Sequence, residues 1–347
     1  MRFFKQTKTS IGYDLGSKDI KIAILEHGKA GARVQQLIRM PLAEGIIVEG
    51  IIFDERAMVE RLQLTLSLVD VRNATVVTGV SSVREAIVRY NQTLQRAPLH
   101  EARAQLQNDK TLVVSVRPEE AIYDLVIVDP DGTGPMMKAV VVTSRKDYLI
   151  KRQRVFREAM IPLHVLDVDA FGLFNIFEIC HPDLAERDIT LVHIGWETEL
   201  IVACTAGVIV ATRQMFAAGT KYLIEAIENS GRIVGGEAEE VLQSDVLHTI
   251  HGDIFKQWVG VAADYVRSVV ESRPNGEGNP LQNVYLSGEG AMIPRIAEAM
   301  ASELGTSVSV FDPLKSLDVA DEIKSRHEND GPIFALALGY AFRGTVT

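Results

Sequence analysis

The sequence predicts an α/β protein made of two halves that share one plan and face each other across a cleft. Residues 11–16 and 190–195 carry this prediction, because each segment ends a strand at a glycine and a new strand begins a few residues later. At the offset that aligns Asp14 with His193, Gly16 also falls on Gly195, and further strands and a helix follow both segments. A third observation is the stretch from about 81 to 147, which interrupts the alternation of strands and helices as an inserted subdomain would.

The first half opens with a predicted β-hairpin. Apolar runs cover residues 10–15 and 20–25, and the glycines of HGKAG supply a turn before the next run at 33–40. Asp54 stands in N-cap position ahead of AMVERLQLTLSLV, where apolar residues recur at helical spacing. Residues 75–80 are typical of a buried strand.

The interrupting stretch predicts a small α+β unit. A polar, partly helical part comes first, and three strands follow, the last two joined by the turn-rich DPDGTGP. The strands are expected over residues 111–116, 122–128 and 138–143. The α/β alternation then resumes with a helix over 146–160, a strand over 163–168 and a second helix after Asp169.

The second half repeats the opening pattern and then becomes mainly helical. Three strands come first, a helix follows Gly219, and helical spacing dominates from 231 to 271. The remaining elements are predicted to be a strand, a helix ended by Gly305, a short strand and a last helix. The predicted strands of this half cover residues 189–194, 199–204, 208–215, 283–286 and 308–311. The last two predicted helices cover residues 293–304 and 332–342.

Composition excludes several classes of function. Thirty-six basic residues against 46 acidic ones leave a net charge of −10, which disfavours nucleic acid as a partner. No window offers about 18 uncharged apolar residues, and the basic N-terminus has no apolar segment of a signal peptide, so no membrane insertion is expected. The two cysteines, Cys180 and Cys204, stand among apolar neighbours, as in a reducing compartment. We therefore expect a cytoplasmic protein.

The first glycine turn contains the residue types of a phosphate loop. Gly16 would let backbone N–H groups approach an anion, and Ser17 and Lys18 could contact phosphate. Asp14 could hold Mg²⁺ through water. A plain hairpin turn, with Asp14 bonded locally and Lys18 in solvent, explains the same spacing and stays open as an alternative.

Several segments together resemble the actin-like ATPase superfamily. In order along the chain they are YDLGSKDIKIAIL, HIGWETELIVACTAGVIVATRQMFAAG, NVYLSGEGAMIPRIAEAM, VFDP and FALALGYAFR. Within the superfamily they are similar to the family of the type IV pilus assembly protein PilM, a relative of FtsA. PLAEGIIVEGIIFD resembles that family's segment after the first hairpin, and APLHEARAQL with VRPEEAIYDLVIVD resembles its inserted subdomain.

The resemblance implies an actin-like fold with two ribonuclease-H-like lobes and a nucleotide between them. Residues 1–81 and 148–188 would form the first lobe, 82–147 the inserted α+β subdomain, and 189–347 the second lobe, with a helical part at about 220–280. The family's first phosphate loop falls on Asp14, Gly16, Ser17, Lys18 and Lys21, with Asp14 as the residue for Mg²⁺. The second phosphate loop and the adenosine loop fall on His193, Gly195, Thr198, Gly219, Gly288 and Gly290.

Departures from the family pattern predict that binding of ATP and Mg²⁺ is weakened or lost. An aspartate is usual where His193 stands, and Mg²⁺ prefers oxygen ligands to imidazole. Trp196 and Glu197 replace small residues after the second turn, Glu289 replaces a glycine, and a lysine that commonly follows the GEAEEVL segment is absent. One extra carboxylate beside a polyphosphate costs on the order of 1–4 kcal/mol, which moves a micromolar site towards millimolar.

The resemblance implies a non-catalytic adaptor in pilus assembly. The N-terminal cytoplasmic tail of a PilN-like inner-membrane protein would dock by the inserted subdomain, other pilus assembly proteins would be further partners, and a homo-oligomeric ring stays open. The alternative is an active ATPase or small-molecule kinase that uses the interlobe cleft. That alternative needs a carboxylate base, for which Asp167 and Asp169 are the candidates.

Overall fold

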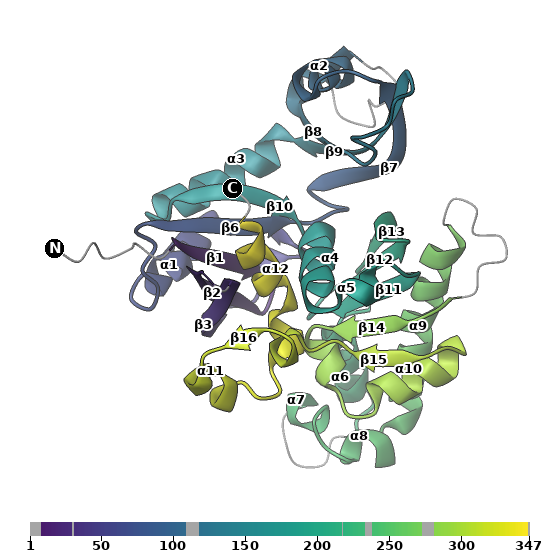
Figure 1. Cartoon of the computed structure of the whole chain (residues 1–347). Helices are drawn as coiled ribbons and strands as arrows, with labels where there is room; N and C mark the ends of the chain where they lie inside the picture. Colours follow the sequence, from purple (N-terminus) through teal and green to yellow (C-terminus); the bar gives the residue numbers. More distant parts are fainter. Residues whose placement is uncertain are drawn as a thin grey trace.

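The computed structural model describes residues 8–29, 31–108, 118–216, 218–232, 238–272 and 281–345. Two large mixed sheets lie on either side of a central pair of helices, and a smaller sheet stands apart at one end (Figure 1). In spatial order, the first sheet contains β10 (Leu163–Val168), β6 (Ala74–Val80), β1 (Lys8–Leu15), β2 (Asp19–Gly28), β3 (Gly31–Pro41) and β16 (Asp318–Val319). The second contains β13 (Val208–Met215), β12 (Glu199–Thr205), β11 (Ile189–Ile194), β14 (Val284–Ser287) and β15 (Val308–Val310).

The two sheets repeat one pattern of strand pairing. β1 runs antiparallel to β2 and parallel to β6, and β11 runs antiparallel to β12 and parallel to β14. The turns repeat as well, because the Gly16 amide donates to the Asp19 carbonyl at 3.0 Å and the Gly195 amide donates to the Thr198 carbonyl at 2.8 Å. The duplication predicted from the glycine spacing is present down to the backbone hydrogen bonds.

The small sheet lies between β6 and β10 in the sequence. Its order is β7 (Ala86–Gln95), β9 (Met136–Arg145) and β8 (Ala121–Ile127), and α2 (Leu99–Asn108) covers it. β8 and β9 match predicted strands, and the strand predicted over 111–116 lies outside the described residues. β7 was missed, because a register shift between Arg89 and Gln92 breaks the two-residue alternation on which strand prediction depends.

Helices cover both large sheets on their outer faces and fill the space between them. α1 (Glu55–Thr65) and α3 (Lys146–Glu158) pack on the outside of the first sheet, and α6 (Thr220–Asn229), α9 (Gly252–Glu271) and α10 (Ile296–Leu304) pack on the outside of the second. α4 (Asp169–Cys180) and α12 (Ala335–Arg343) share one central core with both sheets. The shorter elements are β4 (Ile47–Val48), β5 (Ile51–Ile52), α5 (Pro182–Ala185), α7 (Ala238–Val241), α8 (Val246–Thr249) and α11 (Asp321–Arg326).

The C-terminal part of the chain packs on the first sheet, whereas the predicted division groups all of 189–347 in the second lobe. β16 pairs with β3, and α12 contacts β1, β2, β6 and α4. The approach of α12 depends on Gly12 and Gly339, where an added Cβ would lie 2.0 Å from the carbonyls of Ala337 and Gly172. Hydrophobic periodicity predicts a buried helix here but does not show which sheet the helix covers.

No helix in the described part of the chain has the length and apolar character needed to span a bilayer.

Candidate functional site

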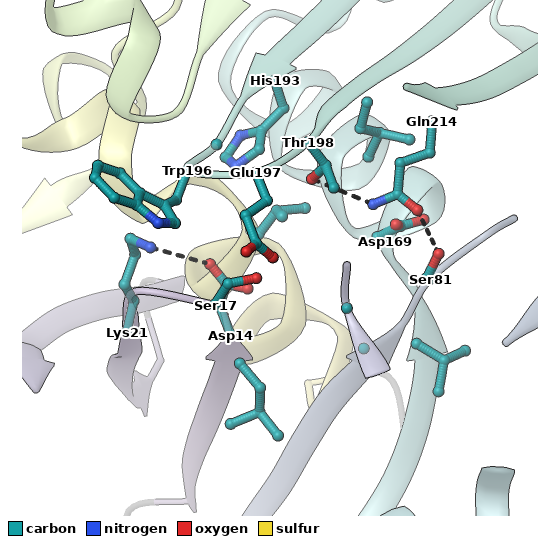
Figure 2. Close-up of a pocket in the computed structure, with 18 of the residues that line it drawn as sticks. Asp14, Ser17, Lys21, Ser81, Asp169, His193, Trp196, Glu197, Thr198 and Gln214 are labelled. Atoms are coloured by element: carbon teal, nitrogen blue, oxygen red, sulfur yellow. Dashed lines mark hydrogen bonds and ion pairs between the residues drawn. The ribbon is translucent and has the colours of Figure 1, made fainter. Parts of the chain in front are cut away.

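The two glycine turns meet at a cavity between the sheets. It measures about 100 Å³ and is lined by residues from both turns, from α4 and from α12. Figure 2 shows Trp196 and Glu197 extending from the second turn towards Asp14 and Lys21, which lie on the strands that flank the first turn. Of the residues predicted for a nucleotide site, this cavity brings together Asp14, Gly16, Ser17, Lys18, Lys21, His193, Gly195 and Thr198.

The other three predicted glycines do not line the cavity but pack against the second turn. A Cβ on Gly219 would lie 2.2 Å from the Trp196 carbonyl oxygen. Gly288 has a φ of +83°, and a Cβ there would lie 2.4 Å from the Ile194 carbonyl oxygen. Gly290 similarly packs on the Ile194 side chain. Close backbone packing therefore accounts for these glycines without a ligand.

The cations beside the first turn, Lys21 on β2 and Arg39 on β3, are paired with carboxylates of this chain. Lys21 bonds to Asp19 and lies 3.9 Å from Asp14, and Arg39 bonds to the other oxygen of Asp19. Burial opposes ionisation of Asp19, but the two cations outweigh it and hold the pKa of Asp19 below its usual value. At Asp14, burial has the largest effect on the pKa and raises it to about 6. Asp19 and Arg39 were missed by sequence reasoning, which had only the turn motif as a guide.

Lys18 is engaged from the opposite lobe. Its Nζ lies 2.5 Å from Glu239 Oε2 and 4.1 Å from the centre of the Trp196 ring. Arg39 likewise contacts the second lobe, because its Nη2 pairs with Glu289 Oε1. Glu289 is the residue that replaces the expected glycine. These pairs join the two lobes over the cavity.

Glu197 receives contacts of the kind that a bound phosphate would receive. Its Oε2 accepts the Glu49 backbone N–H at 2.8 Å, and its Oε1 lies 3.4 Å from Lys221 Nζ. Only 7% of Glu197 is exposed. The chain thus places its own carboxylate between the two turns.

His193 is a neutral, internally bonded residue in this site. Its Nδ1 lies 3.0 Å from Ser287 Oγ, and burial, with a contribution from Lys21, lowers the pKa of His193 to about 3. No group of three or more metal-ligating side chains occurs among the described residues. Asp14 and His193 by themselves are a poor oxygen-ligand set for Mg²⁺.

The two candidate bases face different sites although they are two positions apart. Asp169 lines the cavity, accepts the Ser82 backbone N–H at 3.0 Å, and has its pKa raised to about 7 by burial. Asp167 instead lines a second and larger cavity.

This second cavity is a groove of about 710 Å³ beside the small sheet. β8 and β9 form one wall, β10 and α4 form another, and the turn between β12 and β13 and the end of α12 close it. Its lining is mainly apolar, and 62% of Val126 and 45% of Ile179 are exposed there. The groove residues include Val126, Val142, Phe171, Phe174, Ile179 and Phe342.

A family model described as "Type IV pilus assembly protein PilM" matches residues 12–345, which is nearly the whole chain. The chain belongs to the PilM family. No curated protein matches it closely enough to count as a relative.

Solved structures agree with the actin-like fold of this PilM-family chain. A PilM–PilN type IV pilus biogenesis complex matches with a TM-score of 0.77 and 21% identity over 96% of this chain and 98% of that chain. The ethanolamine utilization protein EutJ of Carboxydothermus hydrogenoformans matches with a TM-score of 0.56 and 16% identity over 96% and 89%. MreB5 of Spiroplasma citri bound to AMPPNP matches with a TM-score of 0.56 and 12% identity over 98% and 97%. The predicted actin-like fold is confirmed.

The cleft of this PilM-family chain does not fit a nucleotide in the arrangement observed. Small-molecule sites measure about 300–1,000 Å³, whereas the cavity between the turns measures about 100 Å³. Glu197 and Trp196 stand between the turns, and Lys18 and Lys21 are already paired with carboxylates. A polyphosphate would have to displace these contacts and meet the charge of Glu197.

Proposed function

We propose that this chain is a cytoplasmic adaptor of the type IV pilus assembly platform. It docks the N-terminal cytoplasmic tail of a PilN-like inner-membrane protein in the groove beside the small sheet, and the tail recruits it to the membrane. The observation that carries the proposal is the 710 Å³ groove with its apolar lining. The complex of PilM with PilN among similar structures supports the choice of partner.

The groove has the properties needed for an extended peptide. Exposed valine and isoleucine side chains on two walls can bury against apolar residues of a tail, and a few such anchors supply most of the affinity in peptide recognition. The walls come from the small sheet and from both large sheets, so one peptide would contact three parts of the molecule.

Calorimetry with a synthetic tail of the PilN-like protein from the same genome tests the proposal. Val126→Asp places a charge on the apolar wall and should weaken binding about tenfold or more. Met160→Asp is the matched control, since Met160 is 76% exposed and does not line the groove. Absence of wild-type binding, or equal loss in both variants, would count against the groove as the docking site.

A second candidate function is phosphoryl transfer in the interlobe cleft. It is favoured by Asp169, a carboxyl that lines the cleft with a pKa raised to about 7, near the value that suits a general base. Calorimetry with ATP and Mg²⁺ on wild type, His193→Asp and Glu197→Ser separates the two functions. An adaptor should show no binding by wild type, whereas tight wild-type binding would favour the enzyme.

A further inference from the structure

The charged residues that line the apolar groove are mostly acidic. Of the described residues that line it, Asp124, Asp167 and Glu178 are acidic, and Arg343 alone is basic. Asp124 and Glu178 are exposed, and Asp124 is already paired with Arg103 at 2.7 Å. Asp167 differs from both because only 8% of it is exposed.

Asp167 has one carboxylate oxygen without a hydrogen bond. Its Oδ1 accepts the Val168 backbone N–H at 2.8 Å, while its Oδ2 is buried and has no hydrogen-bond partner among the described residues. Arg343 Nε is 3.9 Å from that oxygen, beyond hydrogen-bond distance. Buried polar atoms in native proteins nearly always have a partner, so this oxygen needs an explanation. Burial raises the pKa of Asp167, and the Val168 backbone N–H and the charge of Arg343 offset this only in part.

Arg343 is placed so that a ligand cation can replace it beside Asp167 Oδ2. It is the last residue of α12, 38% of its side chain is exposed, and its ion pair with Asp167 is long at 3.9 Å, so the guanidinium can turn to solvent when another cation takes its place at Asp167. A ligand group that entered the groove beside Phe342 and Arg343 would then find the free oxygen of Asp167.

We propose that the groove selects a segment that carries a cationic group, and that Asp167 receives this group in place of Arg343. The inference rests on the proposed function, since it assigns the chemistry of the docked tail. Cytoplasmic segments next to a membrane span carry an excess of Lys and Arg. With Asp124 already paired with Arg103, the groove still presents Asp167 and Glu178 against the one guanidinium of Arg343, which complements such a segment. A charge-assisted hydrogen bond to the buried carboxylate of Asp167 is stronger than a neutral one and would fix the register of an otherwise apolar segment.

The alternative is that Asp167 and Arg343 form a purely structural pair. The two explanations predict opposite signs for Arg343→Met. If a ligand cation competes with Arg343 for Asp167, removing Arg343 should tighten binding of the tail. If the pair only stabilises the groove, the same change should weaken binding or leave it unchanged.

The experiment is calorimetry with the synthetic tail and a series of its variants, in which each Lys or Arg is replaced by norleucine and, in one peptide, the N-terminus is acetylated. Asp167→Asn keeps the shape of the side chain and should lower affinity about ten- to hundredfold. One modified peptide of the series should bind wild type more weakly by the same factor. Its affinity for Asp167→Asn should equal the affinity of the unmodified tail for that variant. Glu178→Gln, a charge change at the exposed rim, should alter affinity less than about threefold.

The outcomes separate this inference from the proposed function. Unchanged affinity of Asp167→Asn, or weaker or unchanged binding by Arg343→Met, would overturn the role of Asp167. Loss of binding in Val126→Asp would still support docking in the groove. No binding of the tail by wild type would overturn both. Thermal unfolding of each variant shows whether it is folded before its affinity is compared.

Discussion

The interlobe contact of Arg39 offers a direct test of how the cleft is held. Arg39 lies between Asp19 and Glu289, and its replacement by Met leaves Asp19 with Lys21 alone and leaves Glu289 without its cation. Only 2% of the Asp19 side chain and 12% of the Glu289 side chain are exposed. Breaking a fully buried pair costs about 3–5 kcal/mol, whereas an exposed pair contributes about 0–1 kcal/mol. Because 39% of the Arg39 side chain is exposed, we expect Arg39→Met to cost about 1–2 kcal/mol.

Urea denaturation of Arg39→Met, Glu289→Gln and the double variant measures this cost and its coupling. The coupling free energy between Arg39 and Glu289 should be about 0.5–1.5 kcal/mol and should shrink as salt is added. Arg33→Met is the matched control, because Arg33 lies on the same strand and its pair with Asp318 is exposed at both ends, so its loss should cost less than about 0.5 kcal/mol. Equal destabilisation by both arginine variants, or no coupling, would refute the idea that Arg39 joins the lobes.

Three further predictions concern buried groups. Asp169 has a pKa of about 7 in the folded chain against an ordinary value of 3.8, so the stability from its bound proton is fully present below pH 3.8 and is lost as the pH rises to 7. Asp169→Asn should remove this decline, which is at most on the order of 4 kcal/mol, in unfolding curves from pH 4 to 8. Glu199 is fully buried with no hydrogen bond from the described residues to either carboxylate oxygen, and burial raises its pKa. The bound proton of Glu199 stabilises the fold fully below pH 4.5 and less at higher pH. Glu199→Gln should therefore raise the melting temperature at pH 8 and leave it nearly unchanged at pH 4, and an equal effect at both pH values would contradict this. Gly12→Ala should destabilise the chain by several kcal/mol because its Cβ would meet the Ala337 carbonyl, whereas Gly260→Ala, with open space around it in α9, should stabilise it by up to about 1 kcal/mol.

Part of the site could be predicted because it is local in sequence. Asp14, Gly16, Ser17 and Lys18 lie within one turn, and the same spacing in the second half placed Gly195 opposite them. The departures at Trp196 and Glu197 were also visible in the sequence. Their consequence was not, since the sequence does not show that Glu197 would bond to the Glu49 backbone and to Lys221.

Other features depended on contacts between residues far apart. Lys18 meets Glu239 across 221 positions, and Arg39 meets Glu289 across 250. Such pairs follow from how the two lobes are placed against each other, which a local pattern of charges does not encode. For the same reason, Asp167 and Asp169, which looked equivalent as candidate bases, lie in two different cavities.

The sequence by itself determined the duplicated strand–turn–strand plan, most of the strands, and the family to which the chain belongs. These depend on residue periodicity, on glycines at tight turns and on the order of motifs, all of which are properties of neighbouring residues. The tertiary structure alone decided that α12 covers the first sheet, that the cleft is filled by the chain's own charged side chains, and that an apolar groove beside the small sheet contains a buried carboxylate oxygen with no hydrogen bond from the described residues. These features arise only when distant segments pack together, because packing determines which charges are paired and which surfaces stay open.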